Sequence, residues 1–215
     1  MEREIIGKKI GMTQLFLEEQ KGAAVAVTVV LAGPCVVTQI KTIEKDGYNA
    51  IQVGFEEQKK QRTTKPEAGH FKKAGTTPKR ILREFRVNEI GDVKVGDVIT
   101  CDKFVAGDFI DVTANTKGHG FTGAIKRHNF SMQNNTHGNS RTTRMQGSIG
   151  QSSTPGRVFK NTKMPGHHGN EQVTVQNLTV VKVDKEKNCI FIKGGIPGPV
   201  GALVTIKNAV KRGAK

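Results

Sequence analysis

Short runs of apolar residues, many alternating with polar ones, recur along the first half of the chain. These runs, rich in β-branched residues, cover residues 10–16, 25–31, 36–43, 49–55, 81–87 and 98–101. A two-residue period is typical of half-buried strands, and no segment sustains the 3.6-residue period of a long helix. Residues 66–73 predict a short helix, with Pro66 near its start. The pattern therefore predicts a mainly β fold with little helix.

The same pattern returns near the C-terminus. The strands predicted there cover residues 173–183, 189–193 and 203–206. Lys45-Asp46-Gly47-Tyr48 predicts a hairpin turn, because Asp-Gly tolerates positive φ. The C-terminal strands need partners, and strands from the first half can provide them. We therefore expect residues 1–111 and 171–215 to form one globular body, a β-barrel or sandwich built from both ends of the chain.

Between these two parts lies a segment without acidic side chains. Residues 112–170 contain eight Lys or Arg, five of the six histidines and nine glycines, but no Asp or Glu. The rest of the chain carries a formal +7 over 156 positions, whereas this segment carries +8 over 59. Because the positive charge is concentrated here, we expect residues 112–170 to form a basic, glycine-rich extension that meets a polyanion.

Most of this extension is poor in residues that can form a core. Between residues 129 and 170, only seven of 42 residues are sizeable and apolar. So few cannot bury enough surface to offset the entropy of ordering the rest. A flexible loop without function is the alternative, but flexibility alone does not explain the absence of acidic residues. We therefore expect a long extended, basic loop that is ordered by threading into folded RNA.

The composition of the whole chain bears on its net charge, on the state of its cysteines and on contact with a membrane. The 215 residues include 34 Lys and Arg against 19 Asp and Glu, a formal net charge of +15. Cys35, Cys101 and Cys189 lie far apart without a CxxC pattern, which favours reduced, buried thiols in a cytoplasmic protein. The apolar run from Ala23 to Ala32 is too short to span a bilayer, so we expect no membrane partner.

The candidate sites for small ligands are weak. Gly118-His119-Gly120-Phe121-Thr122-Gly123 matches the GxGxxG pattern of dinucleotide sites, but the carboxylate that would hold the ribose is missing. His167-His168 has neither a carboxylate nor a thiolate nearby and is a poor metal-ligand set. A dinucleotide-using enzyme is an alternative on the glycine pattern alone. We expect no cofactor, no metal, no small-molecule substrate and no catalytic activity.

The cations and polar residues of the extension instead predict contacts with phosphates and sugars. The predicted RNA-binding residues are Lys117, His119, Lys126, Arg127, His128, Arg141, Arg144, Gln151, Arg157, Lys160, Lys163, His167 and His168. Few aromatic residues lie among them, which favours structured RNA over stacking on single strands. A sequence-tolerant DNA-binding protein is an alternative from charge alone, but no recognition helix is apparent.

Several motifs occur in a specific order along nearly the whole chain. They are Gly7-Lys8-Lys9-Ile10-Gly11-Met12-Thr13-Gln14-Leu15-Phe16, then Phe109-Ile110-Asp111-Val112-Thr113 with the glycine pattern from Lys117 to Gly123, then Gly147-Ser148-Ile149-Gly150-Gln151, Thr154-Pro155-Gly156-Arg157-Val158-Phe159 and Met164-Pro165-Gly166. In this order they resemble the universal large-subunit ribosomal protein L-three family, in its short bacterial form.

The resemblance implies a translation-protein-type β-barrel, with a long loop that runs through RNA towards the peptidyl-transferase centre. It also implies a cytoplasmic structural protein that binds 23S-type ribosomal RNA directly near its 3′ end. Such a protein helps to start subunit assembly and touches neighbouring large-subunit proteins. Some bacterial relatives carry a methylated glutamine shortly after the Gly-Gln pair. This chain has Ser153 there, so that modification is not predicted.

Overall fold

The structure, a computed structural model, describes residues 3–17 and 22–212 and divides the chain into two compact units. The first unit, the body, consists of residues 1–115 and 172–215, and the second consists of residues 116–171. Strands account for 41% of the described residues and helices for 12%, which confirms the prediction of a mainly β fold with little helix. Among the described residues, no helix combines the length and the apolar character needed to cross a membrane.

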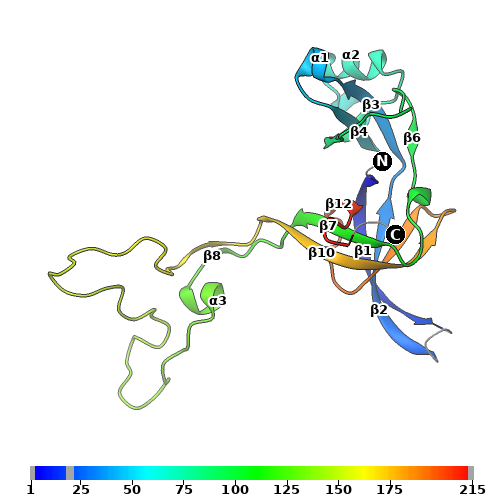
Figure 1. The fold of residues 1–215 in the computed structure, drawn as a ribbon. Helices are drawn as coiled ribbons and strands as arrows, with labels where there is room; N and C mark the ends of the chain where they lie inside the picture. Colours follow the sequence, from blue (N-terminus) through cyan, green and yellow to red (C-terminus); the bar gives the residue numbers. More distant parts are fainter. Residues whose placement is uncertain (1–2, 18–21, 213–215) are drawn as a thin grey trace. The chain divides into compact units, whose positions relative to one another are not determined.

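The body contains a closed antiparallel barrel built from both ends of the chain, as predicted. Its strands, in order around the barrel, are β1 (Glu4–Leu17), β12 (Leu203–Asn208), β7 (Phe109–Asn115), β10 (Gln172–Asp184), β11 (Cys189–Lys193) and β2 (Ala23–Ala32), which returns to β1. Figure 1 labels β1, β2, β7, β10 and β12 among them. Strands β1 and β2 pair with each other as far as Leu17 and Ala23, beyond the residues that pair with β12 and β11.

Period-two alternation places the apolar side chains inside this barrel. Val112 and Ala114 on β7 are buried and lie opposite Ile206 and Val204 on β12. Fully burying a Val or Ile side chain stabilises a fold by about 1.5–3 kcal/mol. The intervening Thr205 is only partly buried, as expected when successive side chains point to opposite faces. The barrel core therefore follows directly from the sequence pattern.

The strands between β2 and β7 do not join the barrel, and the expectation of a single barrel or sandwich is wrong for them. They form a second sheet in the order β5 (Lys79–Arg86), β4 (Ala50–Glu57), β3 (Cys35–Lys41) and β6 (Val98–Ile99). The chain turns at Gly33, whose φ is +82°, and β3 then pairs with β4 and β6 instead of a barrel strand. One cluster of buried residues nevertheless joins this sheet to the barrel.

Local structure in the second sheet agrees with most of the predicted elements. The β3–β4 hairpin is present, but its connection contains the helical turn α1 (Ile43–Asp46), which ends at Gly47 with φ +80°. The predicted strand at 98–101 is shorter, because η3 (Cys101–Lys103) begins a 3-10 turn. A second 3-10 turn, η2 (Lys60–Arg62), precedes helix α2.

Helix α2 (Lys65–Lys73) confirms the predicted helix and its start. Pro66 occupies its first turn, and Thr64 and Glu67 form a capping box. Phe71 is the buried residue of this helix.

The cysteines are also as predicted, since Cys35, Cys101 and Cys189 are all free and buried.

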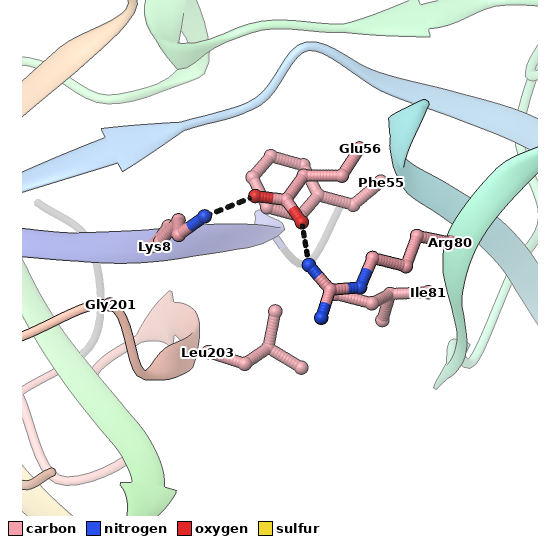
Figure 2. A pocket seen from close by; sticks show the side chains of 7 residues that line it. All are labelled: Lys8, Phe55, Glu56, Arg80, Ile81, Gly201 and Leu203. Atoms are coloured by element: carbon pink, nitrogen blue, oxygen red, sulfur yellow. Dashed lines mark hydrogen bonds and ion pairs between the residues drawn. The ribbon is translucent and has the colours of Figure 1, made fainter. Parts of the chain in front are cut away.

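A small cavity of about 230 Å³ lies where the second sheet meets the barrel (Figure 2). Glu56 at the end of β4 bridges the two parts, because one carboxylate oxygen accepts from Lys8 Nζ on β1 at 2.6 Å and the other from Arg80 Nη1 on β5 at 3.2 Å. Glu56 has φ +54°, which is unfavourable for a residue with a side chain. The bridge and the pairing of β4 with β5 hold it there.

The second unit contains three short elements. Strands β8 (Gly120–Thr122) and β9 (Gly166–His168) form an antiparallel ribbon, and helix α3 (Ala124–His128) follows β8. Residues 129–165 form turns and bends, without a helix or strand. The sequence placed the start of the extension at residue 112, whereas the structure places residues 112–115 in the body, because strand β7 continues to Asn115.

Candidate nucleic-acid interface

The two ends of the second unit are held together by backbone hydrogen bonds. The Thr116 N–H donates to the Glu171 carbonyl at 2.9 Å, and the His119 N–H donates to the His168 carbonyl at 2.9 Å. The β8–β9 ladder continues this pairing to Thr122 and Gly166. The unit therefore has an ordered base, formed by residues that are about 50 positions apart in the sequence.

Glycine is required at one position of this base. Gly169 has φ +75°, and a Cβ atom there would collide with the Lys117 carbonyl. The segments that contain Lys117 and Gly169 can lie this close only because Gly169 has no side chain. The GxGxxG pattern, by contrast, does not open a dinucleotide fold. Strand β8 pairs antiparallel with β9, and α3 is only five residues long.

Two of the predicted RNA-binding residues, both on helix α3, contact the backbone of the loop that precedes β9. Arg127 Nη1 donates to the Met164 carbonyl at 2.9 Å, and His128 Nε2 lies 3.1 Å from the same oxygen. Both side chains are half-buried, whereas Lys126 on the same helix is exposed. Arg127 and His128 thus hold the loop before β9. Arg127 has five N–H donors, so its predicted phosphate contact is compatible with this bond.

Two further predicted residues meet across the ribbon. The imidazole rings of His119 and His168 are stacked, with centroids 5.1 Å apart and planes inclined by 20°. Partial desolvation lowers the pKa of His119 below its ordinary value, and the neighbouring Lys126, His168 and Lys117 act in the same direction. Sequence reasoning selected both histidines but missed their contact. No spacing rule connects residues 49 positions apart, so only the β8–β9 register reveals it.

Lys117 lies exposed before β8. The remaining predicted residues, apart from His167, are spread along residues 129–165 and do not form a compact cluster. Those that are exposed to solvent are Arg141, Arg144, Gln151, Arg157, Lys160 and Lys163, together with His167 on β9. The Arg157 guanidinium lies 5.7 Å from the centre of the Phe159 ring, and Arg144 Nη1 lies 3.8 Å from Met132 Sδ. Phe159 itself is 53% exposed. These cations are therefore accessible to a partner.

No carboxylate within this unit balances its cations, except at its last residue. Residues 116–171 contain eight Lys or Arg and only one acid, Glu171, which gives a formal charge of +7 over 56 positions. The ion pairs in the described part of the chain all belong to the body, for example Arg3 with Asp108 and Lys41 with Glu84. A partner that neutralises this positive charge is a polyanion.

The described residues hold no group of three or more His, Cys, Asp or Glu that could bind a metal ion. His167 and His168 are successive residues of β9, and their side chains point to opposite faces of the ribbon. Their arrangement suits separate contacts with a ligand.

Together, the fold and the site define a basic β-barrel protein with a second, strongly cationic unit. A family model described as ribosomal protein L3 matches residues 75–215 of the chain. The chain is 53% identical to the large ribosomal subunit protein uL3 of Corynebacterium jeikeium, and 51% identical to that of Corynebacterium diphtheriae. Each match covers 98% of this chain and 95% of the relative.

The chain therefore belongs to the ribosomal protein L3 family. This confirms the resemblance inferred from the motifs. The family consists of structural ribosomal proteins and not of enzymes, and the bacterial relatives are parts of the cytoplasmic ribosome.

Proposed function

We propose that this protein is a structural constituent of the large ribosomal subunit that binds 23S-type ribosomal RNA directly through its second unit. The observation that carries this proposal is the set of exposed cations in residues 116–171, which have almost no acidic partner in their own unit. The names of the relatives support the subunit, and the chemistry of the residues supports RNA as the partner.

The proposed binding mode follows from the type of side chain present. Arginine forks match phosphate oxygens in a bidentate way, and small polar residues let the backbone approach the sugar. Residues 129–165 form no helix or strand and expose Met145 and Phe159, so they gain little from packing on themselves. RNA that neutralises and encloses this segment would supply the missing contacts.

The finer role rests on family resemblance. We propose that the protein binds near the 3′ end of the large-subunit RNA and helps to nucleate subunit assembly. The second unit then supports the peptidyl-transferase region without performing chemistry. The body contacts neighbouring large-subunit proteins. Crosslinking in cells followed by RNA sequencing would identify the RNA segments in contact.

A binding experiment tests the RNA interface. The full-length protein is titrated with a 23S RNA transcript at several salt concentrations, alongside Arg141→Glu, Arg144→Glu and the control Lys45→Glu on exposed α1 of the body. If six to eight cations meet phosphates, affinity falls by roughly three or more decades between low and moderate salt. Each reversal in the second unit reduces the salt slope by about 1 or more, and the control leaves it unchanged.

Two results would count against the proposal. Equal displacement of the transcript by duplex DNA would favour a sequence-tolerant DNA-binding protein. In cells, normal subunit profiles and growth for both Arg141→Glu and Arg144→Glu would remove the assembly role. The barrel should stay folded in both variants, because both side chains are exposed in the second unit.

A further inference from the structure

The stacked histidines at the base of the second unit form a cluster of titratable groups that a merely structural ribbon does not need. His119 precedes β8 and His168 ends β9, and the backbone bond between them fixes the two rings on the same face of the ribbon. His119 is exposed and His168 is partly buried. Gly120, next to His119, has open space where a side chain would be. Because His119 is exposed, a ligand can approach its ring.

The charged groups that act on His119 are all positive. They are Lys126 from α3, His168 from β9 and Lys117 from the segment before β8. The acid nearest in sequence, Glu171, lies three residues beyond His168, and its backbone N–H and carbonyl both bond to Thr116. Two stacked imidazoles are compatible when neutral, but two imidazolium ions at this distance repel each other. The free protein therefore disfavours protonation of His119.

An anion placed against the pair reverses this balance. A phosphate oxygen accepts hydrogen bonds from imidazolium N–H groups and attracts the protons that the lysines repel. The two lysines add charge to the same phosphate. The phosphate diester of an RNA backbone is the ligand of this chemistry that the proposed function supplies.

We propose that His119 and His168, flanked by Lys117 and Lys126, bind one backbone phosphate of ribosomal RNA and take up a proton as they bind it. This inference rests on the proposed RNA-binding function and adds its dependence on pH. The lowered pKa of His119 in the free protein is consistent with it.

The direction of the effect follows from linkage. The pair binds protons more tightly in the complex than in the free protein, so affinity for RNA rises as the pH falls through the pKa of the complex. It levels off below the pKa of the free protein. Between these limits, uptake of one proton changes the dissociation constant about tenfold per pH unit.

Calorimetry measures this uptake directly. The full-length protein is titrated with the 23S RNA transcript at pH 7, in PIPES and in Tris, whose ionisation enthalpies differ. We expect an uptake of about one proton, which His119→Gln and His168→Gln each abolish or strongly reduce. His137→Asn is the matched control: His137 lies exposed in the same unit with φ +63°, a conformation that Asn tolerates. The control should retain the uptake.

The pKa values of the histidines, followed by NMR in free and RNA-bound protein, locate the proton. A rise for His119 or His168 on binding supports the inference, and an unchanged pKa for both overturns it. Tight RNA binding with no proton uptake, or with the same uptake in both Gln variants, also overturns it while leaving the proposed function intact. Failure of the wild type to bind the transcript at any pH would instead count against the proposed function.

Discussion

Asp111 is the last acid before the carboxylate-free segment, and its side chain is only 1% exposed. Its two oxygens accept hydrogen bonds from the backbone. One accepts from the Asn177 N–H at 2.9 Å, where β10 contains a bulge between Val175 and Leu178, and the other from the Val210 N–H at 3.2 Å, just after β12. One carboxylate on β7 thus fixes both neighbouring strands of the barrel.

The structure gives the size of the loss when this group is removed. Asp111→Ala removes the acceptor of two part-buried backbone N–H groups, those of Asn177 and Val210, at about 1–3 kcal/mol each. The expected loss is therefore about 2–6 kcal/mol, a large part of the 5–15 kcal/mol typical of a folded domain. Asp111→Asn keeps one acceptor but turns an amide NH₂ towards the other donor, so about 1–3 kcal/mol is lost.

Urea unfolding monitored by circular dichroism checks both variants against Asp92→Asn, which changes an exposed acid of the body. The control should stay within about 0.5 kcal/mol of the wild type. The expected order of the free energies of unfolding is wild type, then Asp111→Asn, then Asp111→Ala. An Ala variant as stable as the control would refute the claim that this carboxylate joins the strands.

Three other properties can be checked in the same preparations. Burial raises the pKa of the Cys35 thiol to about 11, so iodoacetamide at pH 8 should modify Cys35 much more slowly in the native protein than in urea, as measured by mass spectrometry. The hydrogen bond from Lys8 lowers the pKa of Glu56. The bridge therefore stabilises the fold above the ordinary Glu pKa, and this stabilisation is lost on acidification. Glu56→Gln should lower the free energy of unfolding by less than about 1 kcal/mol at pH 7 and by nothing in strong acid. Thermal unfolding of both proteins at each pH measures the difference. Gly169→Ala should push against the Lys117 carbonyl and speed amide exchange across the β8–β9 ribbon, while the unfolding of the barrel stays unchanged; equal exchange rates would contradict this.

The sequence alone determined the strands and the distribution of charge. Alternation placed strands at residues 189–193 and 203–206, where β11 and β12 occur, because a two-residue period is a local property of the chain. The helix at 66–73 followed from Pro66 near its start, whereas the capping box of Thr64 and Glu67 was found only in the structure. The excess of cations in residues 112–170 can likewise be read from the sequence, since it depends on composition alone.

Only the tertiary structure decided which strands are neighbours. It placed β1 between β2 and β12, and it separated β3 to β6 into their own sheet after the turn at Gly33. It also gave Asp111 its backbone partners and brought His119 against His168. These contacts join residues far apart in the chain. Local propensity cannot specify them, because they depend on the register of strand pairing and on the burial of side chains that the whole fold brings together.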